Sequence, residues 1–255
     1  MVAQSEQVLE NKLIEQLVRL GYERVKVESE ADLLTNLQSQ LEKYNKTKFS
    51  ASEFKRIINH LEKGTVFEKA KILRDKFALS CDDGTTKWIE FLDCNNFTSN
   101  HFQVTNQVTI EGTYKNRYDV TILINGLPLC HLELKRRGAE LKKAFNQINR
   151  YQRHSFHANS ALFHYVQIFV ISNGVNTRYF SNNKRQSYQQ TYTWAEKDNT
   201  AINNLDKFAE AFLQREHLSK MISKYIVLAE VHKILMVLRP YQYYATEALV
   251  HTVET

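Results

Sequence analysis

The chain has 255 residues, of which 43% are apolar and 11% aromatic, an ordinary globular composition that excludes wholesale disorder. This length builds one large domain, or one domain and part of a second. The polar N-terminus does not read as a signal peptide, and no apolar run approaches the ~18 residues of a membrane span. The three cysteines are irregularly spaced, which suits reduced thiols in a cytoplasmic protein better than a zinc site.

The formal net charge of +6 is concentrated in one stretch of the chain. Between Lys135 and Arg153 the sequence carries seven basic residues and a single acid, so the remainder balances. Concentrated positive charge suits phosphate backbones. The alternative interpretation is a solvated helix face.

The first part of the chain is predicted to be mainly helical. Residues 6–20 have apolar side chains at helical spacing behind a possible N-cap, Ser5. Residues 22–27 alternate like a short strand. Two further helices are expected over 31–43 and 52–62.

The middle of the chain is predicted to form strands, because it is rich in Val, Ile, Thr and aromatic residues. The expected strands cover 87–93, 102–110, 117–124 and 127–135. A long helix should follow over about 139–156. A buried strand over 166–172 then has a possible hairpin partner at 178–180.

After about residue 200 the periodicity is helical, including the segment around VHKILMVL (231–238). The order of elements predicts an α/β fold, a mixed β-sheet flanked by helices, with a C-terminal helical segment.

The strand LCHLELK (129–135) carries the most informative side chains. His131, Glu133 and Lys135 share one face of it, whereas its other face is apolar. Charged groups on an otherwise apolar strand are costly to bury without partners and often mark functional sites. A divalent cation and a phosphate would supply such partners.

Asp119 on the preceding strand must reach the same face to share this site. A two-residue Asn125-Gly126 turn in unbroken register would pair Asp119 with Leu132 and place it on the opposite face. We therefore predict an odd-length loop or a β-bulge between residues 119 and 133.

On the following helix, Gln147 and Tyr151 are four residues apart and share a face. Ala144, Ile148 and Tyr151 should pack on the sheet, with Gln147 at the margin of that contact. The residues expected to contact DNA are Arg136, Arg137, Lys143, Arg150 and Arg153.

The Asp-x13-Glu-x-Lys spacing alone is a weak signal. The alternatives are an exposed charge pair on the strand and an ordinary helix surface.

The stretch from Asn116 to Phe156 resembles the nuclease core of the motor (R) subunit of type I restriction enzymes, in the PD-(D/E)xK superfamily. Asp119 matches the motif aspartate, in a Tyr-Asp rather than a Pro-Asp context. Glu133-Leu134-Lys135 matches Glu-x-Lys, and residues 147–151 match Gln-x3-Tyr. The resemblance is strong over about 115–155 and weaker over most of 1–200, and it implies a restriction-endonuclease-like core.

The segment LRPYQYYATEAL (238–249) is similar to the region before the first ATPase motif of superfamily 2 motors, where the matching residue, Gln242, would read adenine. The alternative is a short solvated Pro-Tyr turn. The resemblance thus divides the chain into an endonuclease domain, 1–200, and a helical linker with the start of a truncated ATPase motor domain, 201–255.

The resemblance implies a type I site-specific deoxyribonuclease, which hydrolyses double-stranded DNA with Mg²⁺, or Mn²⁺ as a substitute. Asp119, Glu133 and the Leu134 carbonyl would be metal ligands, with Glu10, or alternatively Glu6, joining them. Lys135 would orient or deprotonate the attacking water, and Gln147 and Tyr151 would support the site. ATP-driven translocation and the modification (methyltransferase) and specificity subunits would belong to the full-length enzyme.

Three other interpretations stay open at this stage. The first is another nuclease of the same superfamily, such as a repair exonuclease or a junction resolvase. The second is a non-catalytic DNA-binding module with a degenerate site. The third is a structural coupling domain for a helicase.

Overall fold

The computed structural model describes residues 5–111, 115–154 and 162–254, which are built around a six-stranded mixed sheet. The strand order is β1-β4-β5-β6-β7-β8, with β1 parallel to β4, β6 parallel to β7, and the other neighbours antiparallel. The strands are β1 (Glu23–Arg24), β4 (Phe102–Glu111), β5 (Lys115–Ile124), β6 (Leu127–Leu134), β7 (Ile168–Ser172) and β8 (Thr177–Ser181). The pattern therefore predicted the class of fold correctly.

Side-chain caps define where the N-terminal helices begin. The hydroxyl of Ser5 accepts a hydrogen bond from the Val8 N–H, and Ser29 and Ser50 each form a reciprocal capping box. The helices are α1 (Glu6–Arg19), α2 (Glu30–Tyr44), α3 (Ala51–Leu61), α4 (Val66–Ile72), α5 (Leu141–His154), α6 (Leu205–Phe212), α7 (Arg215–Ser223) and α8 (Pro240–Glu254).

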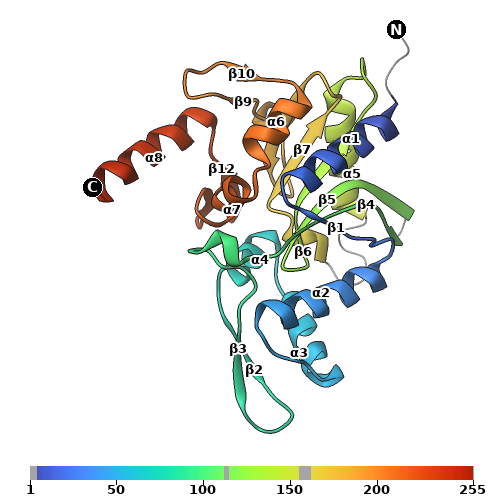
Figure 1. The fold of residues 1–255 in the computed structure, drawn as a ribbon, viewed down its shortest axis with the longest axis vertical. Helices are drawn as coiled ribbons and strands as arrows, with labels where there is room; N and C mark the ends of the chain where they lie inside the picture. Colours follow the sequence, from blue (N-terminus) through green and yellow to red (C-terminus); the bar gives the residue numbers. More distant parts are fainter. Residues whose placement is uncertain (1–4, 112–114, 155–161, 255) are drawn as a thin grey trace.

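Helices α1 and α5 cover opposite faces of the sheet (Figure 1). Glu10 of α1 contacts Asn106 of β4. Asn106 pairs with Val120 of β5, which pairs with Leu132 of β6, so these three side chains lie on one face of the sheet. Tyr151 of α5 instead packs on His131, the neighbour of Leu132 in β6, with ring centroids 6.4 Å apart. Because adjacent residues of a strand point to opposite faces, the two helices enclose the sheet between them.

The hairpin of β5 and β6 combines a two-residue turn with a β-bulge. Ile124 pairs with Leu127 across Asn125-Gly126, but the register shifts between Ile122 and Leu123, which leaves Leu129 as the extra residue. The prediction of a bulge between residues 119 and 133 is therefore confirmed. Beyond the bulge, Val120 lies opposite Leu132, so the next pair in that register is Asp119 with Glu133.

The turn itself requires glycine for two reasons. Gly126 has a left-handed backbone, with φ of +83°, which side chains disfavour. A Cβ at this position would also lie 2.8 Å from the Cα of Leu37, because α2 packs directly on the turn. This close approach fixes the hairpin at the end opposite to the predicted site.

Most elements predicted from the sequence are present, with shifted ends. The expected strand at 87–93 is shorter and pairs in a small hairpin, β2 (Phe77–Ser80) with β3 (Thr86–Ile89), that protrudes from the molecule (Figure 1). The segment 22–27 supplies only the two residues of β1. Residues 155 and 156, the predicted end of the long helix, lie outside the described residues.

The prediction of continuous helix after residue 200 is wrong. Helices α6 and α7 are followed by a hairpin of β11 (Ile226–Ala229) and β12 (Ile234–Val237), and only then by α8. Another small hairpin, β9 (Trp194–Ala195) with β10 (Ala201–Ile202), precedes α6. The β-branched residues Ile226, Val227, Ile234 and Val237 suit the two strands that form there.

One hydrophobic core extends through the sheet and its helices, and it includes residues of α6 and α7. Among the described residues, no helix is long and apolar enough to cross a membrane. Cys81 and Cys130 are buried free thiols, and Cys94 is a partly exposed free thiol.

Candidate active site

Asp119 lies where the pairing of β5 with β6 ends. Its Oδ2 atom accepts a hydrogen bond of 2.8 Å from the backbone N–H of Leu134, so a side chain replaces the next rung of the ladder. Opposite it on β4, Gln107 adopts a left-handed backbone with φ of +57°. The carboxylate of Asp119 is thus fixed to the motif strand by its own hydrogen bond.

Glu133 and Lys135 project together from the end of β6. The Nζ atom of Lys135 lies 3.0 Å from Oε1 of Glu133 and 2.7 Å from the carbonyl oxygen of Leu134. The Glu133 side chain is fully buried, whereas 13% of the Lys135 side chain is exposed. A cation, here an ammonium group, already lies between these two oxygen atoms.

His131 lies on the far side of the Glu133 carboxylate. Its Nε2 atom is 3.3 Å from Oε2 of Glu133, and its Nδ1 atom is 3.3 Å from the hydroxyl of Thr121. Both residues are fully buried. Glu133 is therefore held between an ammonium group and an imidazole ring.

Burial raises the pKa of both carboxyl groups. The pKa of Asp119 rises to about 7 through burial and the adjacent Glu133 carboxylate. Burial also raises the pKa of Glu133 to about 7, although Lys135 acts in the opposite direction. The pocket thus disfavours two ionised carboxylates unless additional positive charge is present.

The Gln147 and Tyr151 pair of α5 lies beside these strands. The Gln147 amide donates to the Tyr151 hydroxyl, which in turn donates to the Arg117 carbonyl of β5 at 3.1 Å. Tyr151 is buried and Gln147 is at the margin, as expected from the helix pattern. The guanidinium of Arg150 lies 5.9 Å from the centre of the Tyr151 ring and lowers the pKa of Glu133, although less than Lys135 does.

Glu6 and Glu10 of α1 line the same shallow cavity of about 330 Å³ as Asp119. Glu10 is buried, and its Oε1 accepts from the amide of Asn106 at 2.5 Å. Glu6 is exposed and accepts from the backbone N–H of Arg136 at 3.2 Å. Both candidates are thus placed near Asp119, and their role as ligands stays a prediction.

The predicted DNA-binding residues are not all gathered at this cavity. Arg136 lines it, and Arg150 lies near Glu133. Lys143 is exposed on α5, and the side chain of Arg153 lies outside the described residues.

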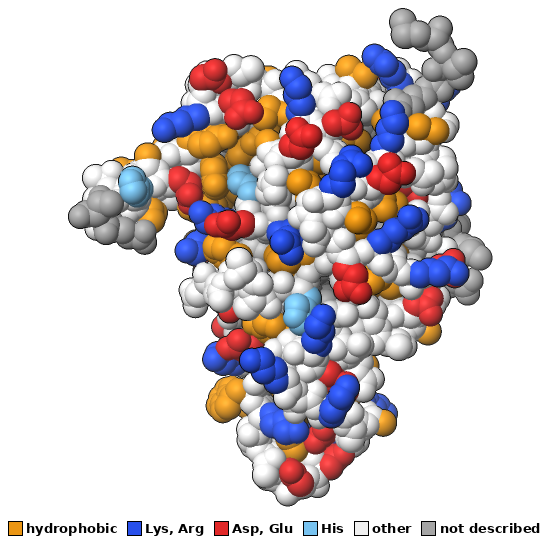
Figure 2. Space-filling view, viewed as in Figure 1, with side chains coloured by type: hydrophobic (Ala, Val, Ile, Leu, Met, Phe, Trp, Pro, Cys, Tyr) orange, Lys and Arg blue, Asp and Glu red, His pale blue; other side chains and the backbone are white. Residues whose placement is uncertain are grey.

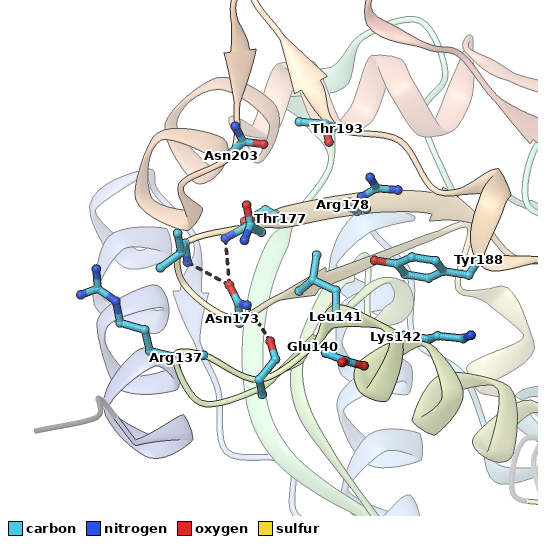
Figure 3. Close-up of a pocket in the computed structure, with 14 residues that line it drawn as sticks. Arg137, Glu140, Leu141, Lys142, Asn173, Thr177, Arg178, Tyr188, Thr193 and Asn203 are labelled. Carbon is cyan, nitrogen blue, oxygen red and sulfur yellow. Dashed lines mark hydrogen bonds between the residues drawn. The ribbon is translucent and has the colours of Figure 1, made fainter.

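Arg137 lines a separate cavity of about 770 Å³, between the loop after β6, the start of α5 and the β7–β8 turn. Asn173 fastens these loops together by donating to the Ala139 carbonyl at 2.7 Å and accepting from the N–H groups of residues 175 and 176 (Figure 3). Arg137 and Lys142 extend away from this cavity on either side. None of the three motif residues lines it.

Within the described ranges, no group of three or more His, Cys, Asp or Glu side chains is arranged to hold a metal ion. Oε1 of Glu133 and the Leu134 carbonyl oxygen both contact the Lys135 ammonium, and Oδ2 of Asp119 contacts the N–H of the same Leu134. Oxygen donors of this kind suit a hard divalent cation.

Three residues at the site were not predicted from the sequence. Asn106 holds Glu10, Arg117 lines the cavity beside Asp119, and His131 contacts Glu133. The alternation of β6 placed His131 on the face of Glu133, which was the only available signal for its role. The other two depend on how α1 packs across β4 and β5.

The family assignment follows from comparison with known sequences. Residues 3–188 match the family described as the type I restriction enzyme R protein N terminus. The chain belongs to this family. The matched stretch includes Asp119, Glu133 and Lys135.

Three relatives of this chain are similar to it over nearly its whole length. The type I restriction enzyme SsaAORF53P endonuclease subunit of Staphylococcus saprophyticus is 47% identical over 98% of this chain and 27% of its own length. The SauMSSORF170P endonuclease subunit of Staphylococcus aureus strain MSSA476 has the same identity and coverage. The EcoprrI endonuclease subunit of Escherichia coli is 40% identical over 99% of this chain and 83% of its own length. The chain thus spans about a quarter of the staphylococcal relatives.

Proposed function

We propose that this chain is the nuclease region of a type I restriction enzyme and hydrolyses phosphodiester bonds of double-stranded DNA with Mg²⁺. The observation that carries the proposal is the β-bulge at Leu129, which sets Asp119 opposite Glu133. It occurs in a chain that belongs to the type I restriction enzyme R protein N-terminal family. The sheet and its flanking helices are consistent with a PD-(D/E)xK core.

The residues present fit a divalent cation. Asp119, Glu133 and the Leu134 carbonyl would hold it, and Glu10, which lines the same cavity as Asp119, is the candidate to join them. The raised pKa values of both carboxyl groups support this assignment, because a cation would offset the charge that burial disfavours. When bound, such an ion polarises the phosphate and offsets its negative charge.

Lys135 has to move before such an ion can bind, since its ammonium contacts two of the oxygens that the ion would take. The released ammonium can then orient the attacking water and offset charge that develops on the phosphate. Gln147 and Tyr151 brace β5 against α5 and keep Asp119 in place. Arg117 and Arg136, on the rim of the cavity, can hold the DNA backbone without reading its sequence.

The proposal extends to a longer enzyme, because the chain spans about a quarter of its staphylococcal relatives. ATP-driven translocation, the adenine contact of Gln242, and the modification and specificity subunits belong to this proposal through the family resemblance alone. In the structure, the exposed Gln242 side chain accepts from the Arg239 N–H at 3.0 Å at the start of α8.

Three isosteric variants test the nuclease: Asp119→Asn, Glu133→Gln and Lys135→Met. In the assembled enzyme each should reduce DNA cleavage by about a thousandfold or more. Circular dichroism and thermal unfolding should show an intact fold. Lys207→Met, at an exposed position of α6, is the matched control and should cleave normally.

Calorimetric titration with Mn²⁺ then separates the roles of the three residues. Asp119→Asn and Glu133→Gln should lose Mn²⁺ binding, whereas Lys135→Met should keep it or bind more tightly, because the competing ammonium is gone. Full cleavage by all three variants would eliminate the nuclease assignment. A wild-type chain that binds no Mn²⁺ would instead favour the degenerate DNA-binding module.

A further inference from the structure

A buried chain of polar contacts leads away from the proposed metal site. It runs from the hydroxyl of Thr121 on β5 to the ring of His131 on β6 and on to Oε2 of Glu133, with both steps at 3.3 Å. All three side chains are fully buried. The other oxygen of Glu133, Oε1, faces Lys135.

Aromatic rings fix the position of the His131 ring. The centroids of Tyr118, Tyr151 and Phe169 lie 5.4, 6.4 and 6.2 Å from its centroid, each with its plane steeply inclined to the imidazole. A ring enclosed in this way keeps Nδ1 facing Thr121 on β5 and Nε2 facing Glu133 on β6. Its orientation is therefore set by packing, and only the location of its proton is left open.

The chemistry of the two ends determines where that proton lies. Nε2 of the ring lies 3.3 Å from a carboxylate oxygen, whereas Nδ1 lies 3.3 Å from a hydroxyl, which can donate or accept. A Glu133 carboxylate that holds a divalent cation is ionised and can only accept hydrogen bonds, which requires the proton on Nε2. Nδ1 is then an acceptor, and the hydroxyl of Thr121 is the donor that matches it.

We infer that His131, oriented by Thr121, is a positioning residue that donates a hydrogen bond to Oε2 of Glu133 and so presents Oε1 to the divalent cation. This inference rests on the proposed function, because it concerns how the chain holds the ion. Groups that orient a metal ligand in this way typically change metal affinity about 10- to 100-fold when removed.

The test compares two substitutions at one position. His131→Gln keeps a donor amide near the position of Nε2, whereas His131→Leu fills similar space with no donor. Mn²⁺ affinity of the chain, measured by calorimetry, should fall at least about tenfold in His131→Leu and stay within about threefold of wild type in His131→Gln. Thermal unfolding of the metal-free variants reports any purely structural effect.

A second variant keeps the inference falsifiable if His131→Leu does not fold. Thr121→Val preserves shape, does not touch Glu133, and removes the hydroxyl that fixes the tautomer, so it should also weaken Mn²⁺ binding. Unchanged affinity in Thr121→Val, or in His131→Leu where it folds, overturns the inference. So does an equal loss in the Leu and Gln variants, which would show a structural role. A wild-type chain that binds no Mn²⁺ removes the proposed metal site, and this inference with it.

Discussion

Asp119 and Glu133 are acids whose surroundings oppose their ionisation when no metal is bound. A carboxyl group with a raised pKa in the folded state binds protons more tightly there than in the unfolded chain. Its contribution to stability is therefore present below pH 4 and is lost as the pH rises toward about 7. The metal-free protein should lose stability over this range because of these two groups.

Asp119→Asn should reveal this penalty at the level of a single residue. The amide keeps an oxygen for the Leu134 N–H but carries no charge. In EDTA at pH 8 the variant should have a free energy of unfolding higher than wild type by ~2 kcal/mol, and the difference should shrink at pH 5. Urea denaturation at both pH values measures it, and an equal difference at the two values would contradict the raised pKa.

The alternation of side chains along a strand was sufficient to assign single residues to one face or the other of that strand. It placed His131, Glu133 and Lys135 on a common face, and it showed that Asp119 needed one extra residue in the hairpin. It could not find Asn106 or Arg117 as neighbours of the site, because their positions depend on the packing of α1 against another strand. Contacts between distant elements have no local pattern.

The turn between β5 and β6 gives a prediction at the level of elements. Gly126→Ala combines a left-handed backbone with a Cβ only 2.8 Å from the Cα of Leu37. We expect a loss of about 2–4 kcal/mol in the free energy of unfolding, measured with urea.

Gly84, in the β2–β3 turn, is the matched control because its φ is +84° but a Cβ there would meet nothing within 4 Å. Gly84→Ala should cost only the backbone part, about 1–2 kcal/mol. Equal losses in the two variants would mean that the packing of α2 on the turn contributes nothing.

Element types were predictable where caps and periodicity agreed, as in α1 and α3 with Ser5 and Ser50 at their starts. They were not predictable in 226–237, where strand-forming residues happen to be spaced like one face of a helix. There the exposed Val227 and Met236 alternate with buried or partly buried neighbours, a pattern visible only once the hairpin is formed. A short apolar segment fits either period, and tertiary packing decides between them.

At the scale of the whole molecule, the segment after residue 200 shares the core of the segment before it. The amide of Gln16 donates to the Asp206 carbonyl, and the hydroxyl of Tyr22 donates to the Leu213 carbonyl, each at 2.8 Å. Phe208 and Phe212 of α6 are fully buried. The predicted boundary at 200 stays a prediction, which truncation can test.

A chain ending at residue 200 should unfold at a much lower temperature than the 255-residue chain, because α1 loses its cover. A chain ending at residue 238, which lacks α8, is the control and should stay folded with a smaller fall in unfolding temperature, since α8 buries Pro240 and Tyr243 in its first half but exposes Leu249 and Val253 in its second. Differential scanning calorimetry compares the three. An unchanged unfolding temperature for residues 1–200 would support an independent domain with that boundary.

The charges are also distributed at this scale. Basic and acidic side chains are interspersed over the face shown in Figure 2, where no continuous basic surface is visible. The net charge of +6 is therefore not presented toward this side as one patch. Under the proposed function, DNA should approach by the edge where β5 begins and β6 ends, where Arg117 and Arg136 line the cavity of Asp119.

The extra residue in β6 makes the hairpin sensitive to odd and even changes in length. Removing one residue between Asp119 and Glu133 would turn one of the two acids toward the opposite helix layer, while the sheet could still close around them. Removing or adding two would restore their alignment. We therefore expect changes of two residues to be tolerated and changes of one residue to inactivate the proposed site. The alignment of the two acids thus depends on whether the number of residues between them is odd or even.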